Sequence, residues 1–405
     1  MSTGAWGVGR VFLKLGAMSY GGPAMIGIMQ AEIERKREWV TRERFVEGLA
    51  LVNFLPGPLA VQLSIVLGYV RAGWLGGVLG GLGFILPGFA IMLTLTILYS
   101  AYGALPALRG VFYGLSPVVI GIFAVAMYRL GRAAIKDRAQ IVIAAGCALL
   151  LGLTPLDIVS TVLLAAAAGV TVYASRRWGL AAVAAVLAVG VARVWLAPST
   201  GLLLAGAATD TASLAAPGLG RLGVFFFKAG AFTFGNGLPI LAVVEDQVVR
   251  QFRWLTAQEF IDGLALGQLT PGPIITPLAA FVGDRVAGVA GAAVSAAAMF
   301  LPSFALVLAV LPFFERLRKI GWIAAALKGL SPAVIGMTTV ALVQMLPHAV
   351  VDVLTALLLV GTVAAMVARG VGPLPVVAAG AVVGVLATLV LRVRRTISAP
   401  EDSRT

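Results

Sequence analysis

The feature that most constrains this chain is a stretch of twenty residues that occurs twice. Residues 39–58 read WVTRERFVEGLALVNFLPGP, and residues 254–273 read WLTAQEFIDGLALGQLTPGP, 215 positions later. Both copies end in Pro-Gly-Pro, where two prolines remove backbone donors and disfavour helix at the residues before them. The fold must therefore hold two homologous halves, each built around the same interrupted segment.

The repeat extends beyond this stretch in both directions. Residues 12–21 read FLKLGAMSYG and residues 226–235 read FFKAGAFTFG, so a lysine and a glycine-containing turn precede each motif. Other matched positions are Glu47 with Asp262, Asn53 with Gln268, Gly68 with Gly283, Pro87 with Pro302, and Ser116-Pro117 with Ser331-Pro332.

Composition indicates a membrane protein. Hydrophobic residues make up 60% of the 405 residues and charged residues 12%, with a mean hydropathy of +1.01. Apolar runs follow one another nearly end to end, many of them long enough to cross a bilayer at about 20 residues each. The runs are continuous and not alternating, and the N-terminus lacks the pattern of a removable signal peptide. We expect an all-α polytopic protein of the plasma membrane, or of the inner membrane in a Gram-negative cell.

The net charge of +13 fits this interpretation. In a soluble protein it would suggest nucleic acid, but here the basic residues gather in loops and at span ends, where they fix topology and meet anionic lipid. We therefore expect lipid contacts and no nucleic acid partner. The sequence leaves open whether two copies form a homodimer. The lone cysteine, Cys147, lies in an apolar run and is interpreted as a packing residue.

Hydropathy and the breaks predict the order of the spans. A first segment with an interruption at residues 19–23 is followed by one broken at Pro-Gly-Pro, and each half has this pair. Whether the first segment crosses the membrane or re-enters stays open. The expected segments are 8–37, 45–71, 74–101, 109–130, 139–153, 156–174 and 178–197, then 221–250, 258–285, 288–314, 321–345, 350–368 and 373–393. We divide the chain into a first repeat plus an unpaired span (1–197), a linker (198–220), a second repeat (221–395) and a disordered tail (396–405).

Loop charges predict that the two halves have opposite orientations. Positive charge marks the cytoplasmic side, and it falls after the fourth segment of the first half but before the matching segment of the second. The unpaired span at 178–197 would supply the odd crossing that inversion requires. The residues concerned are Arg129, Arg132, Lys136 and Arg138 in the first half, and Arg316, Arg318 and Lys319 in the second. Arg392, Arg394 and Arg395 conflict with this scheme, since they fall on the opposite side.

Inverted repeats with helices broken at matching positions are typical of secondary transporters, whose substrate site lies near the midplane. Freed N–H groups and helix N-termini favour an anion, and no carboxylate cluster stands out to hold a cation or metal. The candidate substrate residues are Lys14, Ser19, Tyr20, Gly21, Gly22, Asn53, Pro56, Gly57, Pro58 and Gln62 in the first half, and Lys228, Thr233, Gly235, Asn236, Gly237, Gln268, Thr270, Pro271, Gly272, Pro273 and Thr276 in the second.

Four charged residues near these breaks have two interpretations each. Lys14 and Lys228 would either snorkel to lipid headgroups or attract the anion. Glu47 and Asp262 would either pair with a nearby basic side chain or carry a coupling proton. Ion pairing is the simpler interpretation for Glu47 and Asp262.

The doubled pattern resembles the chromate ion transporter family in its long, two-domain form. The resemblance rests on Phe-x-Lys-x-Gly, the glycine-containing turn, the motif ending in Pro-Gly-Pro, and a Leu-Pro-(Gly/Ser)-Phe span, and it covers most of both halves. It implies secondary active export of chromate from the cytoplasm, with sulfate as the natural isostere. Members often carry a histidine near the positions of Met25 and Leu238, and a glutamine where this chain has Asn53.

Two other classes of function compete with this one. A membrane-embedded enzyme would need acids, histidines or cysteines clustered at membrane depth, and no such motif appears. A passive anion channel could use the same pocket, and sequence does not separate it from a carrier. We expect no cofactor in any of these cases.

Overall fold

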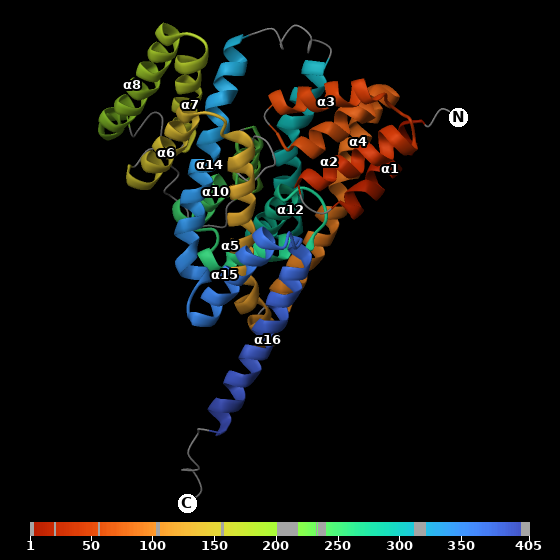
Figure 1. The fold of residues 1–405 in the computed structure, drawn as a ribbon, viewed down its shortest axis with the longest axis vertical. Helices are drawn as coiled ribbons and strands as arrows, with labels where there is room; N and C mark the ends of the chain where they lie inside the picture. The colour runs from red at the N-terminus through yellow and green to blue at the C-terminus, as the bar shows by residue number, and fades with distance from the viewer. Residues whose placement is uncertain are drawn as a thin grey trace, which may run out of the picture.

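The computed structural model describes residues 4–19, 22–55, 57–102, 106–154, 158–200, 218–231, 233, 240–311 and 321–397. These residues form helices joined by short turns (Figure 1). The elements of the first half are α1 (Ala5–Met18), α2 (Gly22–Gln30), η1 (Ala31–Lys36), α3 (Arg42–Phe54), α4 (Leu59–Tyr102), α5 (Pro106–Ala134), α6 (Arg138–Leu153), α7 (Ile158–Tyr173) and α8 (Arg176–Thr200). Those of the second are α9 (Leu219–Ala231), α10 (Ile240–Glu245), η2 (Asp246–Gln251), α11 (Ala257–Leu269), α12 (Ile275–Val310), α14 (Gly321–Ala349), α15 (Val353–Ala368) and α16 (Pro373–Ile397).

The two halves repeat even their irregularities. Each has a π-helical turn, η1 or η2, followed by a non-glycine residue at φ 52°, Glu38 or Arg253. Each long helix is interrupted by non-helical backbone at equivalent positions, Ala72-Gly73 in α4 and Ala287-Gly288 in α12. The described backbone therefore follows the same path twice, as the sequence repeat predicts. Helix α8 has no counterpart among the described residues of the second half.

The repeats are inverted relative to one another. Near the start of α5, Tyr113 Oη donates to Asp352, which lies just beyond the end of α14. Past the other end of α5, Gln140 Nε2 donates to the carbonyl of Lys328 near the start of α14, at 3.5 Å. The equivalent helices α5 and α14 therefore run antiparallel, which confirms the predicted inversion (Figure 1). The predicted basic loop at 316–319 lies outside the described residues.

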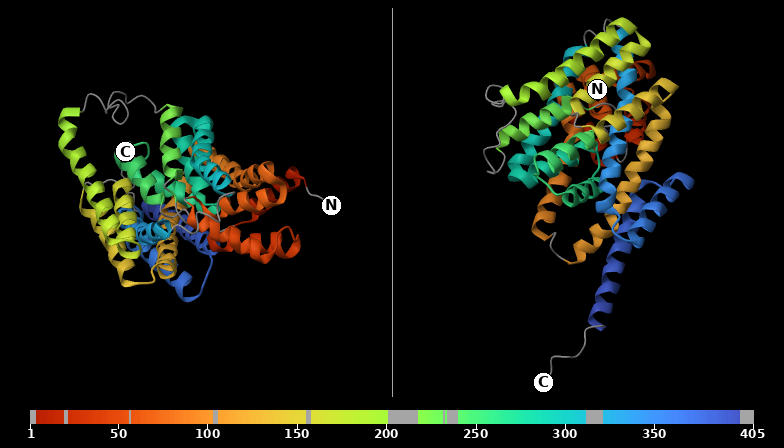
Figure 2. Two further views of the ribbon diagram at one scale, coloured as in Figure 1. Left: turned by 90° about the horizontal axis from the view of Figure 1, so that it is seen from above. Right: turned by 90° about the vertical axis from the view of Figure 1, so that its left-hand side faces the viewer.

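Inversion produces two helical blocks with matched packing. In the first block α1 packs on α4, α9 packs on α12, and α4 packs on α12. In the second, α5 packs on α15 and α16, while its equivalent α14 packs on α6 and α7. Figure 2 (left) shows α1–α4 beside α9 and α12, and α6–α8 on the opposite side of the molecule.

The Pro-Gly-Pro segments do not interrupt a single crossing, as the predicted spans 45–71 and 258–285 assumed. They are the tips of helical hairpins. Gly48 in α3 faces Val66 in α4, so that a Cβ there would lie 3.1 Å from Val66 Cγ1. In the second half, a Cβ at Gly267 would lie 3.2 Å from Pro277 Cβ. The two arms of each hairpin thus lie side by side and run antiparallel. A glycine in the arm before the tip, Gly48 or Gly267, lets the two arms approach closely.

The long helices α4 and α12 also reverse direction, at the interruptions noted above. A Cβ on Gly68 would collide with the carbonyl of Gly76, and one on Gly80 would lie 2.7 Å from the carbonyl of Ser64. Gly73 and Gly288 adopt φ 64° and 61°, a conformation that glycine reaches without steric cost. In each half, the hairpin tip is therefore followed by a short helical arm, then by a second reversal at Ala72-Gly73 or Ala287-Gly288, and then by a long helix.

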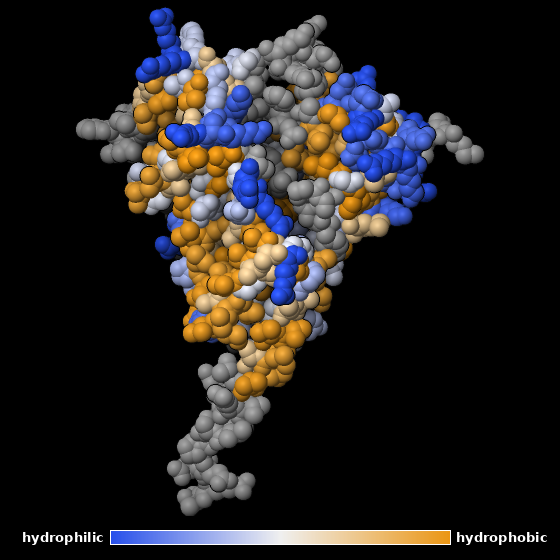
Figure 3. Space-filling view, viewed as in Figure 1, coloured by the Kyte–Doolittle hydropathy of each residue, from blue (hydrophilic) through white to orange (hydrophobic). Residues whose placement is uncertain are grey.

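The described surface matches a membrane environment. Five helical stretches are long and apolar enough to span a bilayer, in α4, α5, α12, α14 and α16. Large apolar side chains on these helices, such as Leu82, Leu301 and Leu386, are exposed. Hydrophilic side chains gather mainly toward the upper end in Figure 3, while the body below is predominantly hydrophobic. Cys147 is buried, as expected, in a small apolar cluster with Val334 and Met337.

Candidate substrate site

The first hairpin tip packs on the second repeat. Gly57 has φ 141°, and a Cβ there would overlap Gln62 Nε2 and lie 2.5 Å from Ser303 Oγ. Both Gln62 and Ser303 are fully buried, and Gly57 and Pro58 are buried as well. The tip is thus seated against α12 beside its internal Pro302.

The second tip packs on the first repeat in the equivalent way. Gly272, at φ 98°, donates its backbone N–H to the carbonyl of Ser19 at 2.7 Å. A Cβ on Gly88 in α4 would lie 2.5 Å from the carbonyl oxygen of Pro271. Thr270 Oγ1 donates to the carbonyl of Leu266 at 3.0 Å, next to α4.

The two tips therefore occupy equivalent places. Gly88 and Ser303 are the matched residues after Pro87 and Pro302, and both lie well inside a membrane-length helix. The helices end where the motif predicts, at Phe54 and Leu269, and resume at Leu59 and Ile275. The described tips therefore lie beside the long apolar helices α4 and α12, and their depth in the membrane stays a prediction. The hairpin geometry and the role of Ser303 were not predicted.

Hydroxyl groups near the tips differ in their hydrogen bonding. Ser303 Oγ and Thr276 Oγ1 are buried and make no hydrogen bond with any described residue. Ser19 and Thr233, by contrast, donate to the carbonyls of Leu15 and Ala229 at 2.6 and 2.8 Å. The hydroxyls of Ser19 and Thr233, both predicted donors, are thus bonded within their own helices. The hydroxyl of Thr276, also predicted, and that of Ser303, which was not, have no partner among the described residues. A buried hydroxyl without a partner costs about 1–3 kcal/mol, so this site favours an added acceptor.

The other predicted residues fall in three groups. Gln268 is half-buried on α11, and the α3 backbone holds Asn53, whose side chain the structure does not describe. Lys14 and Lys228 are exposed at matching positions on α1 and α9, away from the faces of these helices that pack. Gly22 begins α2, Pro273 is buried at the second tip, and Tyr20, Gly21, Pro56, Gly235, Asn236 and Gly237 lie outside the described residues.

The two motif acids have different surroundings. Glu47 is exposed and pairs with Arg44, Nη1 to Oε2 at 3.1 Å, as the ion-pair interpretation predicts. Asp262 is buried, with 6% of its surface exposed. It accepts hydrogen bonds from Tyr99 Oη at 2.8 Å and from Gln258 Nε2 at 2.9 Å. Among the described residues no basic side chain bonds to Asp262, so ion pairing is wrong for this position.

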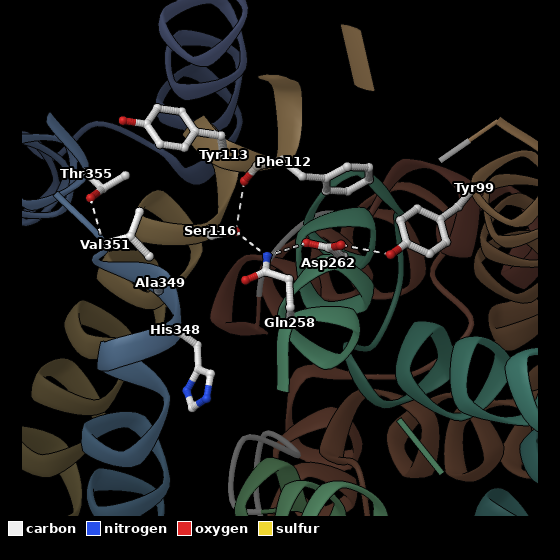
Figure 4. Close-up of a pocket in the computed structure, with 10 residues that line it drawn as sticks. All are labelled: Tyr99, Phe112, Tyr113, Ser116, Gln258, Asp262, His348, Ala349, Val351 and Thr355. Atoms are coloured by element: carbon white, nitrogen blue, oxygen red, sulfur yellow. Dashed lines mark hydrogen bonds between the residues drawn. The ribbon is translucent and has the colours of Figure 1, made fainter. Parts of the chain in front are cut away.

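Asp262 lines a cavity of about 270 Å³ between α4, α5, α11 and α14 (Figure 4). Gln258 joins two of these elements, since its Nε2 also lies 3.2 Å from Ser116 Oγ on α5. His348, Tyr113 and Thr355 complete the polar lining. The described residues contain no group of three metal-ligating side chains.

Asp137 and Asp352 form a second pair of equivalent acids that the sequence reading did not single out. Each caps the helix that follows it and accepts from a tyrosine hydroxyl, Asp137 from Tyr173 and Asp352 from Tyr113. The hydrogen bond from Tyr113, together with the Thr355 N–H, holds the pKa of Asp352 below its usual value. The aspartate that precedes each helix is the signal that could have revealed these caps.

Inverted repeats, hairpins whose tips pack beside membrane-length helices, and buried polar groups at those tips are typical of a multi-pass membrane transporter. The sequence pattern of the chromate transporter family matches residues 6–172 and, a second time, residues 220–385. The chain therefore belongs to the chromate transporter family, as the motif resemblance predicted, and this is a family of transporters and not of enzymes.

Named relatives support the assignment over most of the chain. A chromate transport protein from Cupriavidus metallidurans is 36% identical over 375 residues, covering 91% of this chain and 90% of the relative. A probable chromate transport protein from Synechococcus elongatus is 37% identical and covers 81% of each chain. A chromate transport protein from Pseudomonas aeruginosa is 35% identical, covering 82% and 80%. No solved structure matches this chain.

Proposed function

We propose that this protein is a secondary active transporter that exports chromate, or a sulfate-like oxyanion, from the cytoplasm. The anion would bind where the two hairpin tips meet the kinked helices α4 and α12. Relatives that are named for chromate transport and align over most of this chain support the substrate class.

The buried hydroxyls of Ser303 and Thr276, without partners among the described residues, carry the proposal. A dianion stripped of water needs several hydrogen bonds. Hydroxyls, amides and backbone N–H groups supply these bonds without depending on pH. Release matters as well, because several buried arginines would hold a dianion too tightly for turnover. A tip lined with neutral donors suits a carrier.

A carrier is favoured over a channel by the difference between the two hairpins. The α11 arm is buried along Phe260–Gly267, whereas the equivalent α3 arm is exposed at Val46 and Glu47. An inverted-repeat carrier alternates between its two end states by exchanging the surroundings of its two repeats. In each end state the two hairpins must therefore differ in burial, as α3 and α11 do.

The test is radiolabelled chromate uptake into everted membrane vesicles, with and without an imposed pH gradient, competed by sulfate, molybdate and phosphate. We expect gradient-dependent uptake that sulfate reduces. We also expect counterflow, in which unlabelled chromate inside the vesicle accelerates entry of label. Uptake that follows the membrane potential alone, without counterflow, would identify a channel.

Ser303→Ala tests the site and has a matched control. Removing one buried donor to a charged acceptor should cost roughly 1.5–3 kcal/mol, a tenfold to hundredfold weakening of chromate affinity. Ser295→Ala is the control, because Ser295 is equally buried on the same helix and its hydroxyl has no partner among the described residues. Ser295 packs against Gly283, far along α12 from the tip. Equal effects of the two substitutions would remove Ser303 from the site.

A further inference from the structure

We infer that Asp262 is the proton-binding carboxylate through which anion export is coupled to proton entry. The inference rests on the proposed function, since it names the coupling ion and its site. It starts from the difference between the two motif acids: Glu47 is exposed and paired with Arg44, whereas Asp262 is buried among neutral donors.

The hydrogen bonds of Asp262 suit both of its protonation states. Tyr99 Oη and Gln258 Nε2 donate to the ionised carboxylate. A tyrosine hydroxyl both donates and accepts, so Tyr99 would accept from the protonated acid after a rotation of its O–H bond. A buried carboxylate without a bonded cation is costly to keep ionised, so proton binding at this position is easily reached.

The other charged and titratable groups around Asp262 are less suited to bind the coupling proton. Arg285 on α12 is engaged by Glu259 and Ser100, and its guanidinium lies 5.9 Å from the centre of the Tyr99 ring. Tyr113 on α5 is held by Asp352, in the turn before α15. His348 on α14 faces the same cavity. Glu259 is paired with the cation Arg285, and Asp352 is the exposed N-cap of α15, whereas Asp262 is buried and bonded to neutral donors. Asp262 is therefore the acid in this group best suited to exchange a proton.

A route to Asp262 is present on one side of the protein. The cavity of about 270 Å³ has room for several waters, each of which occupies about 30 Å³ in the liquid. Figure 4 shows His348 and Tyr113 on the side of the cavity that faces away from Tyr99. This is the end of the bundle where α5 begins and α14 ends, opposite the basic residues that follow α5. With those residues cytoplasmic, the proton enters from outside.

Helix α11 connects proton binding to the substrate site. Asp262 lies eight residues before Thr270, about 12 Å along a helix that leads straight to the second tip. Gln258 and Asp262 bond this helix to Tyr99 on α4 and Ser116 on α5. Protonation of Asp262 replaces its charge-assisted bonds to Tyr99 and Gln258 by weaker neutral ones. It thereby loosens α11 and the second tip, where the Gly272 N–H bonds the carbonyl of Ser19.

The experiment compares two modes of chromate transport by the full-length protein in everted vesicles. Asp262→Asn should lose uptake driven by a pH gradient at least tenfold, while chromate counterflow stays within about threefold of the wild type. Asp262→Glu should restore gradient-driven uptake. Glu47→Gln, the matched change in the first repeat, should keep the pH dependence of the wild type. Tyr99→Phe should move the half-maximal pH of gradient-driven uptake upward, because the lost donor stabilises the ionised acid.

Gradient-driven uptake by Asp262→Asn at the wild-type level would overturn the inference. So would loss of both transport modes in Asp262→Asn and Asp262→Glu alike, since that pattern indicates a purely structural role. A second measurement covers variants that insert poorly: chromate binding to purified protein, followed with a pH dye, should move a proton in the wild type and none in Asp262→Asn. Failure of the proposed function looks different, because the wild type would then show neither chromate uptake nor counterflow.

Discussion

The two hairpins share one motif, with ten of the twenty residues of the repeated stretch identical, but they have different surroundings. Helix α11 packs against α4, α5, α12, α14 and α16, whereas the main partner of α3 among the described elements is α4. The matched apolar residues illustrate this, since Val46 is 52% exposed and Ile261 is fully buried. Val46 and Ile261 are similar apolar residues, so their different exposure reflects what packs against each arm. The charged Arg42, Glu43 and Arg44 of α3 stand where α11 has Ala257, Gln258 and Glu259.

Under the proposed carrier mechanism, this difference corresponds to one end state of a transport cycle. In the opposite state α3 would pack as α11 does now, with Glu43 and Glu47 in the places of Gln258 and Asp262. Tyr113 lines the cavity beside Asp262, and its equivalent is Lys328. The equivalent cavity beside Glu47 would then hold a positive charge, so the two acids would act differently in spite of their matched positions.

The largest expected effect distinguishes the two hairpin tips. Gly57→Ala places a Cβ against Gln62 and Ser303 at a positive φ, which combines crowding of about 1–3 kcal/mol with backbone strain of about 1–2 kcal/mol. At Gly272 the nearest heavy atom to a new Cβ is 4.0 Å away, so Gly272→Ala incurs the strain alone. Chromate uptake and thermal inactivation should both show Gly57→Ala as the more damaging change. Equal damage would show that the tips are packed alike.

The next effect concerns the matched amides. Gln268→Leu and Asn53→Leu should weaken transport at low substrate tenfold to hundredfold, since each removes a donor worth roughly 1.5–3 kcal/mol toward an anion. Expression and membrane insertion should be unchanged. Normal transport by both variants would rule out a pocket of neutral donors.

Stability should also differ between the motif acids. Asp262→Leu leaves Tyr99 Oη and the Gln258 amide without their acceptor, a loss of about 1–3 kcal/mol for buried groups. Glu47→Leu breaks an exposed ion pair, worth about 0–1 kcal/mol. Thermal unfolding in detergent should show a clear downward shift for the first variant and little for the second. Matching shifts would contradict the difference in burial.

The smallest effect is expected at the exposed lysines. Lys14→Met and Lys228→Met remove charges that act on the anion only at a distance, worth about 0.2–1 kcal/mol. This corresponds to at most a roughly fivefold weakening of chromate affinity, measured as the substrate concentration for half-maximal uptake. If the lysines prove more damaging than the amides, charge and not neutral donors holds the substrate.

Much of the architecture could be predicted from the sequence. The repeat, the ends of the helices at Pro-Gly-Pro and the unpaired α8 follow from residue spacing and hydropathy. The reversal at each tip could not, because hydropathy marks a break without giving the direction of the chain after it. Ser303 was missed since its role depends on contact with the other repeat. The contrast between Glu47 and Asp262 is also absent from the sequence, where both are acids at one motif position.

The exchange of surroundings between the hairpins can be measured directly by cross-linking. Two cysteine pairs are placed in a Cys147→Ala background, Ser116→Cys with Gln258→Cys and the equivalent Ser331→Cys with Glu43→Cys. With a short bifunctional thiol reagent, the first pair should link in substrate-free vesicles, where Gln258 Nε2 lies 3.2 Å from Ser116 Oγ. The second pair should link during chromate turnover, and either link should stop transport. Linking of both pairs at once in the same molecules, or no linking of the second pair during turnover, would contradict the account.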